Sequence, residues 1–155
     1  VENLALGFGY ATGAGGRIKW REETKRAKQL LLDLGFDINV RAPVAMLGAA
    51  ERTGVAIARA LQDLDSGVSI VVLDEPTAAL GVAQTEQVLN LVRRLADKGL
   101  AVVLISHNLN DIFQVADNIA ALYLGNMAAQ VKKSDVSTNQ VIELITTGKS
   151  EGVTK

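Results

Sequence analysis

The sequence has no cysteine among its 155 residues, which excludes disulfide frameworks, thiolate zinc sites and cysteine nucleophiles. It also lacks long hydrophobic runs: the longest, at 70–73 and 100–105, fall far short of the ~20 residues that span a bilayer. Neither sign of charge is in excess, since 16 Lys and Arg stand against 17 Asp and Glu. A broad electropositive field for a nucleic-acid backbone is therefore missing, and we expect no nucleic-acid partner.

The N-terminus lacks the features of a natural start. It reads Val1-Glu2-Asn3-Leu4, with neither an initiator methionine nor the basic region of a signal peptide. We therefore expect a fragment of a longer protein. Hydrophobic residues make up 48% of the 16.4 kDa chain, which is enough to bury a core, and the length favours one domain.

Apolar residues at helical spacing predict several amphipathic helices. The best defined runs over 83–98, where the apolar stripe repeats at i, i+3, i+4 and i+7 and Gly99 ends the pattern. The stripe of the 50–61 helix is Val55, Ala58 and Leu61. Further helices are expected at 22–34, 111–116 and 137–147. The glycine-rich stretch 7–16 predicts a flexible loop without regular structure.

Two short apolar runs, 68–73 and 101–105, predict strands that are covered on both faces. With the 83–98 helix between them they form a βαβ unit, so the fold class is α/β with a mostly parallel sheet. Residues 119–124 and 127–131 predict a hairpin, in which Gly125-Asn126 supplies the positive φ angles of a tight turn. The helix at 137–147 follows this hairpin.

Polar groups follow both parallel strands. Asp74 and Glu75 come directly after the first strand, at the edge where open α/β sheets place their ligands, and His107, the only histidine, follows the second. One carboxylate can hold a metal ion through water while the other reaches a nucleophile, and the imidazole can bind a terminal phosphate. Taken singly, each residue is more often a loop or capping residue.

Together, the segment 71–77 (Val-Val-Leu-Asp-Glu-Pro-Thr) and Ser106-His107 after the next strand resemble the ATP-binding cassette (ABC) ATPases. The resemblance implies part of a P-loop NTPase-type fold with a helical subdomain, and ATP and Mg²⁺ as cofactors. It implies that Asp74 holds Mg²⁺ through water, that Glu75 is the general base and that His107 contacts the γ-phosphate. Gly81 falls in the family's D-loop, where aspartate is commonest.

The family signature Leu-Ser-Gly-Gly-Gln aligns with residues 47–51, ahead of a helix that carries the matching Ala58-Arg59-Ala60-Leu61. The resemblance implies that Gly48, Ala49, Ala50 and Glu51 face ATP held by a second subunit. Each departure opposes that contact: methyl groups replace glycine hydrogens, the serine hydroxyl is missing, and a negative charge stands near phosphate.

The P-loop, Gly-x-x-x-x-Gly-Lys-[Ser/Thr], does not occur in the sequence. Gly148-Lys149-Ser150 matches only its end, because Glu143 stands at the first glycine position and a helix precedes it. We therefore interpret 149–155 as a solvated tail. The glycines at 13–16 likewise lack a dinucleotide-binding pattern and a preceding strand.

The resemblance runs from Val1 to about Gly148, with 1–60 as helical subdomain and signature helix and 61–148 as part of the ATPase core. It is greatest to bacterial importers of ribose, xylose and galactosides. This implies an ATPase subunit on the cytoplasmic face of the inner membrane, partnered by a second cassette, a transmembrane permease and, indirectly, a sugar-binding protein. The alternative is a degenerate subunit that binds and regulates an active partner. The isolated chain is expected to be inactive and to leave apolar sheet surface exposed.

Overall fold

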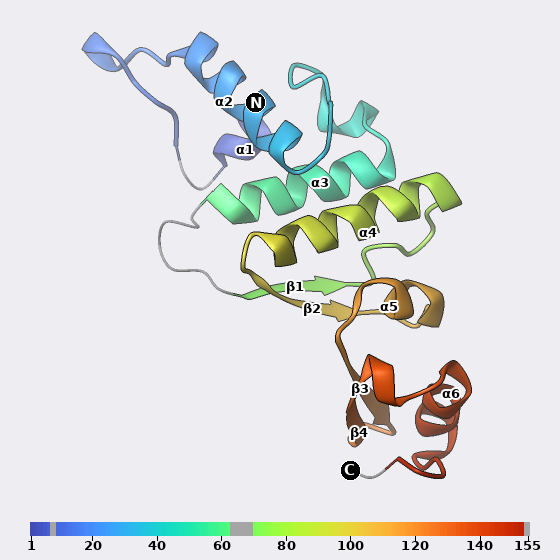
Figure 1. The fold of residues 1–155 in the computed structure, drawn as a ribbon. Helices are drawn as coiled ribbons and strands as arrows, with labels where there is room; N and C mark the ends of the chain where they lie inside the picture. Colours follow the sequence, from blue (N-terminus) through green and yellow to red (C-terminus); the bar gives the residue numbers. More distant parts are fainter. Residues whose placement is uncertain (7–8, 63–69, 154–155) are drawn as a thin grey trace. The chain divides into compact units, whose positions relative to one another are not determined.

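The computed structural model describes residues 1–6, 9–62 and 70–153 (Figure 1). The chain divides into two compact units, 1–103 and 104–155. The first holds the helices and short 3-10 turns α1 (Glu2–Ala5), η1 (Ala14–Gly16), α2 (Trp20–Asp33), η2 (Val44–Met46), α3 (Ala49–Ala60) and α4 (Val82–Asp97), together with the strand β1 (Ile70–Asp74). The strand β2 (Ala101–Ile105) runs across the boundary between the units. No helix in the described ranges is long and apolar enough to cross a membrane.

The core of the first unit lies where α3 packs against α4 (Figure 1). The predicted stripe of α4 is buried, and so is that of α3, in which Val55, Ala58 and Leu61 are at most 5% exposed. Burial of each large aliphatic side chain contributes about 1.5–3 kcal/mol, so these stripes hold the two helices together. The helices predicted at 22–34, 50–61 and 83–98 are confirmed to within two residues at each end.

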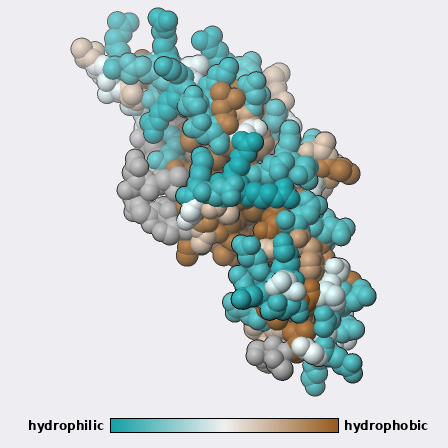
Figure 2. All heavy atoms as spheres, in the orientation of Figure 1, coloured by the Kyte–Doolittle hydropathy of each residue, from teal (hydrophilic) through white to brown (hydrophobic). Residues whose placement is uncertain are grey.

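The strands β1 and β2 form a two-stranded sheet and run in the same direction on either side of α4 in the chain (Figure 1). The predicted βαβ unit is thus confirmed. The prediction that both faces are covered is wrong, because Ile70 and Val72 are 60% and 61% exposed and Val103 is 48% exposed. Figure 2 shows hydrophobic atoms at the place of these strands. The expected exposure of apolar sheet surface is confirmed. Val68 and Ser69 of the predicted strand lie outside the described residues.

The glycine-rich stretch is more regular than expected. Thr12 and Ile18 form an antiparallel bridge, and the amide of Gly13 donates to the carbonyl of Arg17 at 2.9 Å, which closes a tight turn around η1. Glu23 of α2 is buried, and its Oε1 accepts a hydrogen bond from the amide of Ala11 at 2.8 Å. The expectation of a loop without regular structure is therefore wrong for residues 12–16, whereas residues 9–11 form no helix or strand, as expected. Gly7 lies outside the described residues.

The second unit contains α5 (Leu109–Val115), the hairpin β3 (Asn118–Tyr123) and β4 (Asn126–Lys132), η4 (Lys133–Asp135) and α6 (Thr138–Thr147). The helices and the antiparallel hairpin are as predicted. The turn is not: positive φ occurs at Leu124 and Gly125, not at Gly125 and Asn126. The core forms between the hairpin and α6, where Ala121, Ala128 and Ala129 pack against Leu144.

Candidate functional site

Two carboxylates stand where β1 ends. Asp74 is the last residue of the strand and is exposed, whereas Glu75 is half-buried and its Oε2 atom is shielded from solvent. Glu75 has φ +46°, in the left-handed region that few residues other than glycine adopt. Non-glycine residues in this region cluster at functional sites, where the surrounding structure holds them in place. The two neighbouring carboxylates therefore differ in exposure and in backbone conformation.

The segment after Glu75 is a compact turn that leads into α4. The carbonyl of Glu75 accepts a hydrogen bond from Ala78 at 3.1 Å, and that of Thr77, which is buried, accepts one from Leu80 at 3.2 Å. The turn ends at Gly81, the N-cap of α4, whose amide donates to Oε1 of Gln84 at 3.2 Å. The predicted D-loop position thus lies at a helix N-terminus that the helix's own glutamine caps.

The predicted signature residues lie at the N-terminus of α3. Gly48 is the N-cap, and its amide donates to Oε2 of Glu51 at 2.7 Å. Ala49 is half-buried and Ala50 is 2% exposed, so the methyl group of Ala50 belongs to the core. A carboxylate is favourable in the first turn of a helix because it interacts with the helix dipole. Glu51 therefore occupies the position that an external anion would take at this terminus.

Gln84 connects the two helix starts. A Cβ atom built on Gly48 would lie 3.5 Å from Glu51 Oε2 and 4.0 Å from Gln84 Nε2, while Gln84 Oε1 accepts from Gly81. The structure thus brings Gly48 and Gly81 to either side of one side chain. Sequence reasoning missed Gln84. The available signal was the spacing Gly-x-x-Gln at 81–84, which repeats the Gly-x-x-Glu of 48–51 and is half of a capping box.

His107 lies between β2 and α5 and is exposed. The chain around it is held by Asn108, whose amide donates to Ser106 Oγ at 3.0 Å and whose Oδ1 accepts from the amide of Asn110 at 3.1 Å. Asp74 and Glu75 belong to the first compact unit and His107 to the second. That the imidazole faces the two carboxylates therefore stays a prediction.

The two parts of the site differ in how well they fit their expected ligands. An exposed Asp74 carboxylate fits a hydrated Mg²⁺, which is bound in proteins by one or two carboxylates and water. Within the described part of the chain, no three metal-ligating side chains gather into a cluster. The start of α3 does not fit a phosphate as it stands, because Glu51 holds the Gly48 amide and brings a negative charge.

No protein-family model matches the chain. It is similar to the xylose import ATP-binding protein XylG of Moorella thermoacetica, with 36% identity over 128 residues, which are 83% of this chain and 25% of XylG. It is also similar to the fructose import ATP-binding protein FrcA of Rhizobium meliloti, with 38% identity over 83% of this chain and 48% of FrcA. The chain thus spans between a quarter and about half the length of these relatives.

The chain is also similar in fold to solved structures of ABC transporter proteins. A putative metal-chelate type ABC transporter in an inward-facing conformation matches 86% of this chain and 52% of its own, with a TM-score of 0.68 and 24% identity. A dimeric bacterial ABC transporter cassette matches 84% of this chain and 54% of its own, with a TM-score of 0.62 and 27% identity. The α/β fold is therefore that of part of an ABC ATPase domain. The relatives with 36% and 38% identity are ATP-binding proteins of sugar importers.

Proposed function

We propose that the complete protein to which this chain belongs binds and hydrolyses ATP to energise the import of a sugar. The proposal is supported by 36% and 38% identity to sugar import ATP-binding proteins, in a chain where the exposed carboxylate of Asp74 ends β1 and the half-buried one of Glu75 follows it. Since the sequence holds no P-loop, residues outside this chain would cradle the phosphates.

The residues would share the chemistry as follows. When bound, ATP would supply the phosphoryl group whose phosphorus the water attacks, and Mg²⁺ would neutralise charge on the phosphate oxygens. Asp74 would hold the cation through water. Glu75 orients the attacking water and accepts its proton, a task suited to a carboxylate shielded from solvent. His107 donates a hydrogen bond to the terminal phosphate.

The proposal extends to partners and location. A second cassette completes the nucleotide sites, a transmembrane permease carries the sugar, and a sugar-binding protein delivers it. The protein then lies peripherally on the cytoplasmic face of the inner membrane. This part of the proposal is supported by the relatives, which are named import ATP-binding proteins, and by the dimeric cassette among the structural neighbours.

A second candidate is a degenerate cassette that regulates an active partner and does not itself complete a nucleotide site. The hydrogen bond between Gly48 and Glu51 favours it, because the amide that would meet a phosphate already has an anionic partner. The two candidates differ in whether the protein promotes ATP turnover.

Steady-state ATP hydrolysis and equilibrium binding of a fluorescent ATP analogue test the choice. In the complete protein, Glu75→Gln should abolish turnover and leave analogue binding within about twofold, since only proton acceptance is lost. The matched control is Glu22→Gln, which removes an exposed carboxylate that pairs with Lys19 at 3.1 Å. Unchanged turnover in Glu75→Gln contradicts the role of Glu75. A wild-type protein that binds the analogue without hydrolysing it favours the degenerate candidate.

A further inference from the structure

Gln84, in the first turn of α4, uses only one end of its side-chain amide within that helix. Its Oε1 accepts a hydrogen bond from the main-chain amide of Gly81 at 3.2 Å. A main-chain amide can only donate, so it faces the carbonyl oxygen of the side chain and leaves the two N–H donors of Nε2 at the other end. Among the described residues, none accepts a hydrogen bond from this Nε2. The side chain is exposed, so the donor is open to a molecule outside the chain.

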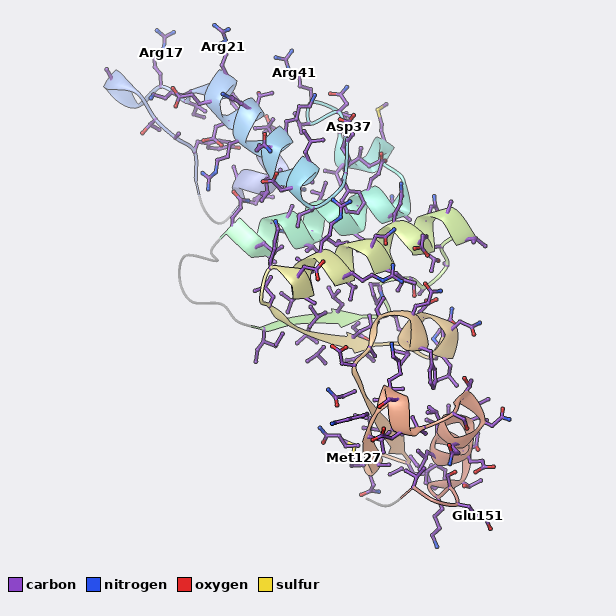
Figure 3. The ribbon with its side chains drawn as sticks, viewed as in Figure 1. Arg17, Arg21, Asp37, Arg41, Met127 and Glu151 are labelled. Carbon is purple, nitrogen blue, oxygen red and sulfur yellow. The ribbon has the colours of Figure 1, made fainter. Side chains whose placement is uncertain are left out.

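The unused end of the Gln84 amide lies next to the start of a different helix. The helices α3 and α4 pack against each other and begin at the same end of the pair (Figure 1), and side chains occupy the space between them (Figure 3). A Cβ atom built on Gly48, the N-cap of α3, would lie 4.0 Å from Gln84 Nε2. A serine hydroxyl is one bond beyond Cβ, so Nε2 lies beside the place where a hydroxyl of residue 48 would be.

Position 48 is also where the chain lacks a hydrogen-bond donor. The signature that aligns with residues 47–51 has serine at this position, and glycine brings no hydroxyl. The main-chain amide of Gly48 does not take its place, because it already donates to Glu51 Oε2 at 2.7 Å. Two side-chain atoms of the described residues lie within 4 Å of the Cβ position: the acceptor Glu51 Oε2 and the donor Gln84 Nε2. A donor at this helix start therefore comes from α4 and not from α3.

We propose that Gln84 replaces the missing serine hydroxyl, with its Nε2 group donating a hydrogen bond to the terminal phosphate of ATP held by a second subunit. The inference rests on the proposed function, because it assigns a further binding residue to the same nucleotide site. A hydrogen bond to a phosphate is charge-assisted, so one neutral amide offsets part of the repulsion from Glu51. The N-termini of α3 and α4 lie side by side, and both helix dipoles favour an anion there.

Position 48 can accept a serine without strain, so the two donors can be exchanged in one protein. Gly48 has φ −62° and ψ 162°, which are values that any residue adopts at a helix N-cap. The contacts of an added Cβ, at 3.5 Å and 4.0 Å, are ordinary van der Waals distances. Serine is also a preferred N-cap residue. We therefore expect Gly48→Ser to fold as the wild type does and to return the hydroxyl.

The test is a double-variant cycle in the complete protein, measured by the Kd of a fluorescent ATP analogue and by the KM for ATP. Gln84→Leu removes the donor and should raise both constants by about tenfold, a typical loss for a hydrogen bond to a charged group. Gly48→Ser/Gln84→Leu should recover most of this loss, because the serine hydroxyl then donates instead. The matched control is Gln87→Leu, the same substitution at an exposed position of α4, which should change both constants less than about twofold.

Gln84→Glu separates hydrogen-bond donation from helix capping. Glutamate keeps an oxygen for the Gly81 amide, and its charge is favourable at a helix N-terminus, so a capping role alone predicts equal or higher stability and an unchanged Kd. Loss of the donor, with a negative charge in its place, predicts instead that the Kd rises by tenfold or more. Urea unfolding of the same variant shows that the helix start is intact.

The outcomes distinguish this inference from the proposed function. An unchanged Kd in Gln84→Leu or Gln84→Glu overturns the inference, and so do equal losses in Gln84→Leu and Gly48→Ser/Gln84→Leu; wild-type ATP hydrolysis then leaves the proposed function in place. A wild-type protein that neither binds the analogue nor hydrolyses ATP overturns both. If the wild type binds the analogue without hydrolysing it, the proposed function fails and the Kd values alone decide the role of Gln84.

Discussion

The main-chain amide of Gly48 donates a hydrogen bond to the Glu51 carboxylate, with 2.7 Å between the nitrogen and Oε2. The first turn of α3 is therefore capped from within the helix. A charge-assisted contact of this kind stabilises a helix N-terminus, and it does so with the group that an incoming phosphate would have to displace. Helix stability and anion binding thus compete at this terminus.

Glu51→Gln tests that competition. The amide oxygen of glutamine keeps an acceptor for Gly48 but removes the negative charge, so we expect a loss of about 0.3–1 kcal/mol in the free energy of unfolding. If phosphate meets this terminus, the apparent KM for ATP of the complete protein should fall severalfold, since removing a carboxylate ~4 Å from an anion relieves about 1–4 kcal/mol of repulsion. Denaturant unfolding and ATPase kinetics measure the two effects.

The control for Glu51→Gln is Glu86→Gln, which removes an exposed carboxylate of α4 that pairs with Arg93 at 3.3 Å. It should alter neither the KM nor the stability by a measurable amount, because surface ion pairs contribute little. An unchanged KM in Glu51→Gln, with the small loss of stability present, would show that no phosphate approaches α3.

Replacing the loop residues is a stronger version of the same test. Gly48→Ser/Ala49→Gly/Ala50→Gly restores a hydroxyl and two close-approach positions, so ATPase activity should rise if the loop limits it. Ala50 is buried, and glycine in a helix costs up to ~1 kcal/mol relative to alanine, so stability should fall by about 1–2 kcal/mol. Higher stability or unchanged activity would contradict this account of the loop.

The sequence predicted the helices well because their burial follows a local period. In α4 the residues Val88, Leu91, Val92 and Leu95 recur on one side, and all four are at most 5% exposed. The strands were less predictable. Val72 fits a strand covered on both faces, yet it is 61% exposed, because a residue pattern does not say whether the covering elements lie within the chain.

In the hairpin, a bulge in β4 moves the turn by one residue from the position that the sequence predicts. Ala121 pairs with Ala129 but Leu122 pairs with Met127, so Ala128 is an extra residue in β4 and forms a bulge. The turn residues become Leu124 and Gly125, and Leu124 takes φ +47° against its own preference. Asn126 instead holds the turn through a hydrogen bond from Nδ2 to the Leu124 carbonyl at 3.1 Å.

Some residues of the candidate site could be predicted from the sequence and one could not. Asp74 and Glu75 could be placed from the sequence because they follow a strand directly. The contact of Gln84 with Gly81 is local and is indicated by their spacing, whereas its approach to Gly48 depends on α3 and α4 packing side by side. That second contact depends on the tertiary structure and on no single segment.

Gly54 should be sensitive to a single added methyl group. An alanine Cβ there would lie 2.7 Å from Cε2 of Phe36, whose ring is 4% exposed and has little room to move. Overpacking of this kind costs about 1–3 kcal/mol, against a gain of up to ~1 kcal/mol from alanine in a helix. We expect Gly54→Ala to lower the free energy of unfolding by roughly 1 kcal/mol in urea titrations.

Gly13→Ala is the matched control for Gly54→Ala, since its nearest neighbour would be Lys19 Cε at 3.5 Å and its φ is −100°. Its stability should stay within about 0.5 kcal/mol of the wild type. The double variant Gly54→Ala/Phe36→Leu replaces the ring by a smaller side chain, so it should recover the part of the lost stability that is due to the clash. A stabilised Gly54→Ala variant would mean that the Phe36 ring moves aside at little cost.

Gly148 combines two constraints at the end of α6. Its φ is +77°, and a Cβ would lie 2.6 Å from Cδ1 of Tyr123 on β3. The left-handed conformation costs a residue other than glycine about 1–2 kcal/mol, and the contact with the ring adds an overpacking term of similar size. Gly148→Ala should therefore destabilise the second unit by roughly 2–4 kcal/mol, measured by denaturant unfolding and by amide hydrogen exchange in α6.

Gly152→Ala separates the two constraints, because Gly152 has nearly the same φ, +76°, but its nearest neighbour would be Gln140 Nε2 at 3.9 Å. It should show the backbone cost alone, about 1–2 kcal/mol. The difference between the two variants then measures the clash with Tyr123, and Tyr123→Leu should reduce that difference. Equal losses in Gly148→Ala and Gly152→Ala would show that the backbone, and not the packing of α6 against the hairpin, sets the requirement for glycine at position 148.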